Sequence, residues 1–399
     1  MRVLFVCHRL PFPPNRGGKI RPFNILRHLA EKHSVTVASI ARSEQELEAG
    51  RELADHCDKV IAEVIPSAPA VWRMVARLPG SVPSSFGYFY SPRLAERIRQ
   101  EHAARPFDLV FVHCSSAAQY VEDLPIPRKI LDFGDMDSQK WLIYGKVRRP
   151  PLSLGYRLEG FKLEREERRL AGRFDLCTCT TRAELQTLES LNEDTPKDWF
   201  PNGVDLEFFS PPDVPYEPDT ICFSGRFDYF PNQEGALSFC KDVFPRIRAQ
   251  RPEARLTLVG ANPSPAIRRL AQIPGVTVTG TVPDVRPHVS QSAVSVAPLN
   301  IARGTQNKIL EALAMGVPVV ASEIASFGVD VVPGEHLLTA KTPGEFAEAV
   351  LRLLDDADER RRFSEAGRAR VESRHSWPNS MKALDRILDS QLLQPERVD

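Results

Sequence analysis

The chain has 399 residues, more than the ~250–300 at which one hydrophobic core usually stops growing, so two domains are expected. Its formal net charge of zero gives no indication of a nucleic-acid partner, and seven dispersed cysteines in mostly apolar runs predict reduced, structural thiols. The apolar N-terminal run is too short for a signal peptide, and no run approaches the ~18–20 residues of a membrane span. A soluble, cytoplasmic protein is therefore expected, at most peripheral to the inner face of the membrane.

Short apolar runs alternate with amphipathic, helix-length segments through the first half of the chain. Strands are expected at 3–7, 35–40, 60–65, 109–113, 130–133 and 176–180, with helices at 20–32, 92–104 and 158–171. Such alternation predicts a parallel sheet that is covered by helices on both faces.

The same pattern restarts after a proline-rich stretch. Further strands are expected at 221–224, 256–259, 276–279, 294–297 and 318–321, and helices at 232–250, 265–272, 284–291 and 308–315. The predicted class is α/β, with two Rossmann-like, doubly wound domains facing across a cleft. We expect an N-terminal domain at 1–200, a linker at 201–218, a second domain at 219–376 and a C-terminal segment at 377–399. The helix at 377–393 either caps its own domain or crosses back to the N-terminal one.

Two segments carry residues suited to a phosphorylated ligand. Gly17 and Gly18 precede a helix, so the backbone there can approach an anion closely, although an ordinary loop is equally compatible. In the second half, 304–320 reads as a loop, a helix and a buried strand, with Glu311 expected in the first helical turn. Its carboxylate suits two ribose hydroxyls and Lys308 suits a phosphate; otherwise both merely solvate a surface helix.

Four motifs resemble those of the family 4 retaining glycosyltransferases, which have the GT-B fold. They are the segment 308–320, the 200–205 segment Phe-Pro-Asn-Gly-Val-Asp, the Gly17-Gly18 pair and the Ser224-Gly225-Arg226 run. The resemblance implies that Arg226 contacts the donor diphosphate, and that Gly304, Thr305, Asn202 and Gly17 also lie at the donor. The segments 132–141, 227–232 and 301–308 further resemble the sugar transferases encoded with PEP-CTERM/exosortase systems, which implies a role in exopolysaccharide assembly.

Two positions depart from the family pattern. Arg303 stands where the family usually has a glutamate, and Pro231 stands where it usually has a lysine. Arg303 and Lys308 together are expected to restore the positive charge at the donor. The identity of the donor sugar is not predictable, because the missing glutamate often contacts that sugar.

Acceptor-side candidates follow strands of the first half. Asp132, Asp135 and Asp137 come just after an expected strand, and Asp135 is the first choice for a catalytic role, with His113 and Gly18 beside it. The alternative for any of these aspartates is a turn or an N-cap. His8 and His113 also lie at strand ends, where a histidine is more often a structural residue than a functional one.

The segment 140–173 holds ten basic and four acidic residues among aromatic and aliphatic ones. An exposed basic–aromatic face there would contact an anionic membrane that carries a lipid-linked acceptor. A solvated helix with ion pairs is the alternative reading.

These patterns and the resemblance predict a hexosyltransferase that moves sugar from a nucleotide-diphosphate donor to a saccharide or lipid-linked acceptor with retention of configuration. Phosphate neutralisation by Arg and Lys predicts that no metal and no cofactor take part. Two alternatives stay open from the residues alone: a nucleotide-sugar epimerase or hydrolase, and a non-catalytic two-domain binding protein.

Overall fold

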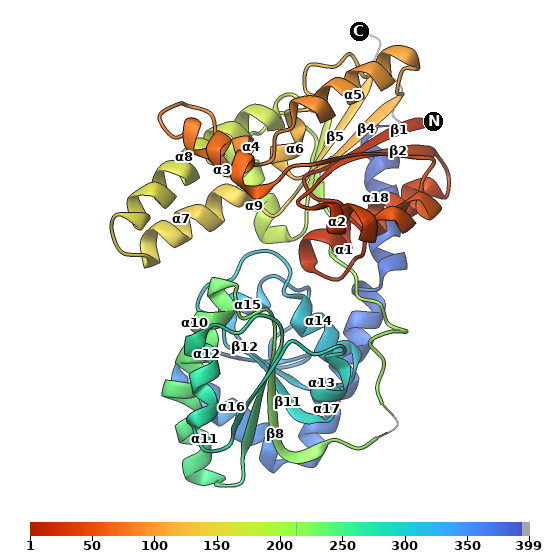
Figure 1. The fold of residues 1–399 in the computed structure, drawn as a ribbon. Coiled ribbons are helices and arrows are strands. Elements are labelled where there is room, and N and C mark those ends of the chain that lie inside the picture. The colour runs from red at the N-terminus through yellow and green to blue at the C-terminus, as the bar shows by residue number, and fades with distance from the viewer. Residues whose placement is uncertain (213, 393–399) are drawn as a thin grey trace. The chain divides into compact units, whose positions relative to one another are not determined.

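The computed structural model describes residues 1–212 and 214–392. The chain forms two compact units, of which the first comprises Met1–Phe200 with the chain from Met381 onward and the second comprises Pro201–Ser380. Each unit has one parallel sheet with helices on both faces (Figure 1). The predicted class of two doubly wound α/β domains is therefore confirmed.

The sheet of the first unit has seven strands in the order β3-β2-β1-β4-β5-β6-β7. The strands are β1 (Arg2–Cys7), β2 (Ser34–Ala41), β3 (Lys59–Val64), β4 (Leu109–His113), β5 (Arg128–Gly134), β6 (Leu176–Cys179) and β7 (Lys197–Trp199). The helices are α1 (Gly17–Ala30), α2 (Glu44–Ala49), α3 (Ser67–Ala76), α4 (Ser84–Tyr88), α5 (Pro92–Ala104), α6 (Ser115–Ala118), α7 (Asp137–Val147), α8 (Leu152–Ala171) and α9 (Arg182–Leu191), with a 3₁₀ turn at Arg51–His56.

The sheet of the second unit has six strands in the order β10-β9-β8-β11-β12-β13. The strands are β8 (Glu217–Ser224), β9 (Arg255–Val259), β10 (Val276–Gly280), β11 (Ser292–Ala297), β12 (Val319–Ser322) and β13 (Leu338–Ala340). The helices are α10 (Phe230–Ser238), α11 (Phe244–Gln250), α12 (Pro265–Arg269), α13 (Arg286–Ser290), α14 (Asn307–Ala314), α15 (Glu323–Ser326), α16 (Pro343–Asp355), α17 (Ala357–Arg374) and α18 (Trp377–Leu392), with a π turn at Phe239–Val243 and a 3₁₀ turn at Leu270–Gln272.

The strands and helices follow from ordinary local chemistry. Every residue of β1, β4 and β11 is buried, as central strands covered on both faces require. Several helices begin at a hydroxyl that accepts a backbone N–H: Ser91 caps α5, Thr181 caps α9 and Thr342 caps α16.

The structure differs from the sequence prediction in several elements, among them two strands and one helix. The three-residue strands β7 and β13 were not predicted, because so short a run shows no periodicity. The helix predicted at 232–250 is α10 and α11 joined by the π turn, just before Pro245. Proline has no N–H to continue the helical ladder, which accounts for the irregular turn.

The last described helix, α18, begins in the second unit and ends in the first. Its Asp385 accepts a hydrogen bond from His28 Nε2 at 2.7 Å and pairs with Lys32 at 3.2 Å, both on or next to α1. Residue 393, the predicted helix end, lies outside the described residues. Within residues 1–212 and 214–392, every helix is too short or too polar to span a bilayer.

Candidate functional site

The centre of the second sheet is where its strand order reverses. β8 and β11 are neighbours there, and the connections that follow them run in opposite directions across the sheet. In open parallel sheets, ligands bind beyond the carboxyl ends of the strands at this position. The residues that follow β8 and β11 therefore form the first candidate site.

Arg226 and Lys308 are joined by Asn232, a residue that the sequence did not single out for this role. Asn232 Nδ2 donates to the Arg226 carbonyl at 2.9 Å, and Lys308 Nζ donates to Asn232 Oδ1 at 3.1 Å. A Cβ atom at Gly225 would lie 2.8 Å from Asn232 Nδ2, so glycine is needed for this approach. The amide holds the strand-end loop and the start of α14 together.

The Arg226 guanidinium lies at the surface in an ion pair. Its Nε donates to Asp228 Oδ1 at 3.1 Å and its Nη2 donates to Asp228 Oδ2 at 2.6 Å. That side-chain hydrogen bond raises the pKa of Arg226 and lowers the pKa of Asp228. Asp228 thus positions the guanidinium, and Nη1 points away from this fork–fork pair.

Lys308 and Glu311 are half-buried on α14. Glu311 is the fifth residue of the helix, so its predicted place in the first turn was wrong; Lys308 occupies that turn. Burial lowers the pKa of Lys308 to about 8, an effect that Glu311 opposes, and burial raises the pKa of Glu311 to about 7, an effect that Lys308 opposes. A titratable pair with both pKa values displaced toward neutrality is a common property of ligand sites.

The loop before α14 is shaped by close backbone contacts. Gly304 has φ +63°, a left-handed conformation that favours glycine, and a Cβ at Gly328 would lie only 2.0 Å from its carbonyl oxygen. Gln306 Nε2 donates to the Arg303 carbonyl at 3.1 Å, while Thr305 and Arg303 are half-buried. The loop is thereby held at the helix start.

Asn202 lies elsewhere in the second unit, in a joint built around His375. Its carbonyl accepts from His375 Nδ1 at 3.0 Å, and the Val204 N–H donates to the His375 carbonyl at 2.7 Å. A Cβ at Gly203 would lie 2.7 Å from Trp377. This packing explains why the Pro-Asn-Gly-Val segment needs a glycine, and none of these contacts involves Lys308 or Arg226.

In the first unit, Gly17 and Gly18 are the first two residues of α1. No heavy atom lies within 4 Å of the position that a Cβ of Gly18 would take, so packing within the unit does not require glycine there. The side chain at the helix cap, Arg16, makes no capping hydrogen bond. The helix start therefore keeps backbone donors for a ligand.

Asp132, one of the three aspartates proposed for the acceptor side, is a structural residue. It is fully buried and accepts two hydrogen bonds from Arg21, at 2.8 and 2.9 Å, with others from His113 Nδ1 and Thr178 Oγ1. Burial alone would raise its pKa, but Arg21 and His113 hold that pKa well below the usual range. Both carboxylate oxygens of Asp132 are thus engaged by Arg21, His113 and Thr178.

Asp135, in contrast, is exposed on a loop whose backbone is tightly held. The loop starts at Gly134, which has φ +68°, and Asp135 itself accepts from Thr180 Oγ1 at 2.7 Å. The N–H of Met136 donates to Glu184 at 2.9 Å, and that of Ser138 donates to Glu167 at 3.0 Å. The sequence did not reveal these two carboxylates, because they lie on α8 and α9, far along the chain.

His8, just after β1, and His113, the last residue of β4, lie together at the switch point of the first sheet. The ring centroids of His8 and His113 are 6.0 Å apart; His113 is buried, and His8 is half-buried against Phe89. Burial lowers the pKa of His8 well below its usual value. The ring of His113 is oriented by the hydrogen bond between its Nδ1 and Asp132.

The aspartates do not converge on a common point. Asp137 pairs with Lys140 one helical turn later, whereas Asp132 faces Arg21. Among the described residues, no group of three His, Cys, Asp or Glu side chains is arranged to hold a metal ion.

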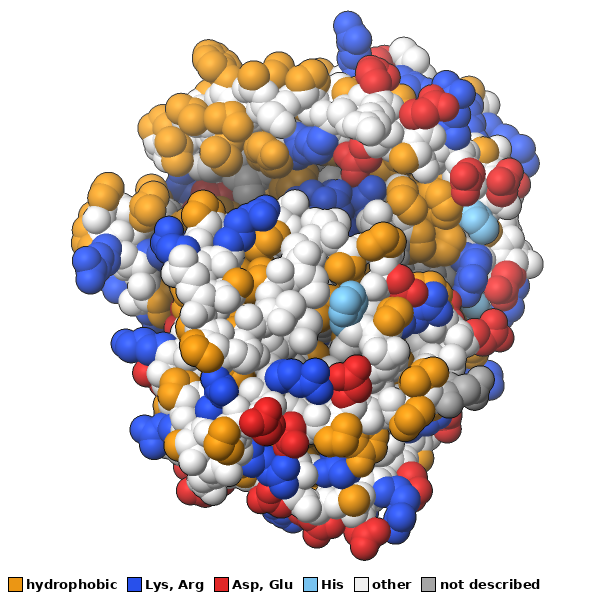
Figure 2. All heavy atoms as spheres, turned by 60° about the horizontal axis from the view of Figure 1, so that its bottom comes forward, with side chains coloured by type: hydrophobic (Ala, Val, Ile, Leu, Met, Phe, Trp, Pro, Cys, Tyr) orange, Lys and Arg blue, Asp and Glu red, His pale blue; other side chains and the backbone are white. Residues whose placement is uncertain are grey.

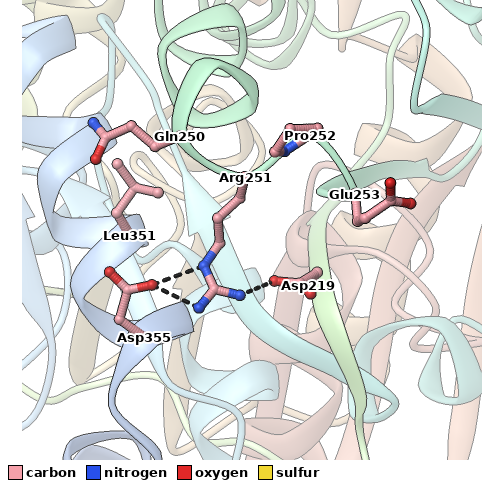
Figure 3. A pocket seen from close by; sticks show the side chains of 7 residues that line it. All are labelled: Asp219, Gln250, Arg251, Pro252, Glu253, Leu351 and Asp355. Carbon is pink, nitrogen blue, oxygen red and sulfur yellow. Dashed lines mark hydrogen bonds and ion pairs between the residues drawn. The ribbon is translucent and has the colours of Figure 1, made fainter.

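A cavity of about 390 Å³ lies at the opposite edge of the second sheet (Figure 3). Arg251 crosses it, paired with Asp219 near the start of β8 and with Asp355 at the end of α16. These ion pairs tie helix ends to the amino end of a strand, away from the edge at which parallel sheets bind ligands. The cavity is not the candidate site.

Comparisons with known proteins bear on the fold. Residues 218–356 match the family model described as Glycosyl transferases group 1. Sucrose-phosphate synthase from Thermosynechococcus elongatus superposes with a TM-score of 0.73 at 19% identity, over 98% of this chain and 99% of that one. The fold is GT-B. Another GT-B structure, Anabaena HepE in complex with UDP, has a TM-score of 0.70 at 14% identity, over 98% of this chain and 100% of the other.

A curated sequence relative matches part of the chain. Phosphatidyl-myo-inositol mannosyltransferase of Mycobacterium leprae is 28% identical over 214 residues, which are 51% of this chain and 55% of that protein. The chain thus aligns with about half the length of this curated relative.

Proposed function

We propose that this protein transfers a sugar, as a hexosyltransferase, from a nucleotide-diphosphate donor to a saccharide or lipid-linked acceptor, with retention of configuration and without a metal ion. The observation that carries the proposal is the arrangement beyond β8 and β11, where Asn232 joins the backbone carbonyl of Arg226 to the ammonium of Lys308, with Glu311 one turn further along α14. Two cations and a carboxylate in this order suit a diphosphate followed by a ribose. The family match over 218–356 supports this reading.

The donor contacts follow from the chemistry of each group. The departing diphosphate gains negative charge in the transition state, so Arg226, Lys308 and Arg303 lower the barrier when they face it. Gly304 and Thr305 place the backbone of the loop near the phosphates, and Gly17 adds the start of α1. The carboxylate of Glu311 accepts from the ribose hydroxyls.

On the acceptor side, the proposed catalytic residues are Asp135, His113 and Gly18. Asp135 is exposed on a fixed loop, and His113 is oriented by Asp132. The resemblance of three further segments to the transferases of PEP-CTERM/exosortase systems supports a place in exopolysaccharide biosynthesis. We place the protein in the cytoplasm, where nucleotide sugars are made.

The test is nucleotide binding by calorimetry, with UDP, GDP and ADP as probes. Glu311→Gln should weaken binding of the ribonucleotide about 10- to 100-fold, since hydrogen bonds to a charged group contribute roughly 1.5–3 kcal/mol. It should leave the much weaker binding of the 2′,3′-dideoxy analogue unchanged. Glu348→Gln, an exposed change on α16, is the matched control. Equal losses for both analogues would show that Glu311 does not bind the ribose.

A further inference from the structure

The exposed apolar side chains of the first unit are not scattered. Among its described residues, every large exposed hydrophobic except Met1 falls in one of two segments: Val71, Trp72, Val75, Leu78 and Val82 in the first, and Val147, Leu152, Leu154, Leu158 and Phe161 in the second. Trp72 is 73% exposed, and Leu154 and Phe161 are each 62% exposed. Clustered apolar exposure of this kind marks an interaction surface.

The two segments are joined into one surface by hydrogen bonds. Lys162 Nζ on α8 donates to the carbonyls of Arg77 and Leu78, at 3.3 and 2.7 Å, just after α3. Glu159 accepts from the N–H groups of Ser84 and Ser85 at the start of α4. Figure 2 shows apolar side chains gathered at the upper left of the molecule, on the side where Figure 1 labels α3, α7 and α8. We call the ten residues the apolar face.

The charges beside the apolar face are predominantly positive. The chain has no Asp or Glu from 64 to 95 or from 138 to 158, whereas it has three Arg in the first range and five Lys or Arg in the second. Of the acids that follow these ranges, Glu159 is buried and accepts from two backbone amides, whereas Glu164, one turn after Phe161, is half-buried. A cationic rim around exposed Trp, Phe and Leu side chains is complementary to an anionic lipid surface. The same rim would repel a second copy of itself.

We propose that the apolar face inserts into the interface of an anionic membrane, with α3 and α8 as the contacting elements. This changes the prediction from sequence, which relied on a basic–aromatic face within 140–173. Lys162, one of those residues, is buried and holds backbone carbonyls, so it is not available to lipid. The segment around α3 was not expected to take part at all. The inference does not depend on the transfer reaction.

Trp72 serves as a built-in reporter of insertion. Vesicles of phosphatidylcholine mixed with phosphatidylglycerol should shift the tryptophan emission to shorter wavelength, and brominated acyl chains should quench it. Trp72→Phe should lose most of the quenching, because the other three tryptophans, at 141, 199 and 377, lie outside the apolar face. Quenching that persists unchanged in Trp72→Phe would overturn the proposed orientation.

A second variant tests the energetics. Leu154→Ser with Phe161→Ser should weaken binding to anionic vesicles about 100-fold, because two large side chains would no longer leave water. Both are exposed, so circular dichroism and thermal melting should match the wild type. Phe327→Ser, at a side chain that is 63% exposed in the second unit, is the matched control and should bind normally.

Salt and self-association distinguish the remaining outcomes. High salt should weaken but not abolish binding, because it screens the cationic rim and leaves apolar insertion in place. Binding that salt abolishes and the double substitution does not affect would overturn insertion. Lipid-free dimerisation that the double substitution removes would assign the apolar face to a second copy of the chain instead.

Discussion

Lys308→Met removes the positive charge at the start of α14 and keeps the half-buried stem. In the structure Nζ donates to Asn232 at 3.1 Å and to Gln306 at 3.4 Å, and it lies 5.9 Å from the Phe223 ring centroid. A hydrogen bond from an ammonium to a phosphate is worth roughly 1.5–3 kcal/mol, so affinity for a nucleoside diphosphate should fall about 10- to 100-fold.

The pH dependence gives this prediction a second readout. Because burial lowers the pKa of Lys308 to about 8, wild-type affinity should decline as pH rises through about 8 and the ammonium loses its proton. The Lys308→Met variant should lack that decline. Calorimetry at several pH values measures both effects.

Lys341→Met is the matched control, since Lys341 is exposed and pairs with Glu323 at 3.2 Å. A surface ion pair contributes ~0–1 kcal/mol, so this variant should bind like the wild type. If folded Lys308→Met bound nucleotide as tightly as the wild type, with the same pH profile, the assignment of Lys308 to the diphosphate would be refuted.

Three further predictions follow from the buried charges and the phosphate chemistry. Asp132→Asn should lower the free energy of unfolding by ~3–5 kcal/mol in urea, because Arg21 stays buried without a counter-charge; a loss below ~1 kcal/mol would contradict this. Since the pKa of Asp132 is held low, the wild type should lose this contribution only as pH falls below ~4. Burial raises the pKa of Glu167 to about 8, so the folded state favours the protonated carboxyl. The stability that this preference adds is complete below pH ~4 and is lost as pH rises toward 8. Wild-type unfolding free energy should thus fall by up to ~1.4 kcal/mol per pH unit over that range, and Glu167→Gln should flatten the profile. Turnover should persist in chelator, because cationic side chains and helix starts neutralise phosphate; complete loss that magnesium or manganese restores would reject this.

Much of the fold could be predicted from sequence because buried strands and helix starts leave local signals. Arg226 was recognisable from its place just after a strand, and Lys308 from its place at the start of a helix. Asn232 was not, because its bridging role depends on where α10 lies relative to α14. Strands β7 and β13 have three residues each, too few to show a period.

The three clustered aspartates show the limit most clearly. The sequence prediction grouped Asp132 with Asp135 just after a strand. In the structure Asp132 lies within β5 and is buried against Arg21, 111 positions away, whereas Asp135 is exposed on the loop that follows. The supporting carboxylates of Glu167 and Glu184 belong to later helices. Only the tertiary structure distinguishes Asp132, which is buried in a hydrogen-bonded network, from Asp135, which is exposed on the loop.

The most direct test of the account is mass spectrometry of products formed from a panel of nucleotide sugars and lipid-extract acceptors. The account predicts release of a nucleoside diphosphate with an acceptor heavier by one sugar, and NMR of that product should show the donor's anomeric configuration retained. Asp135→Asn should reduce this product and leave nucleotide binding unchanged. Sugar turnover that needs no acceptor and yields free sugar or an epimer would contradict transfer and favour a hydrolase or an epimerase.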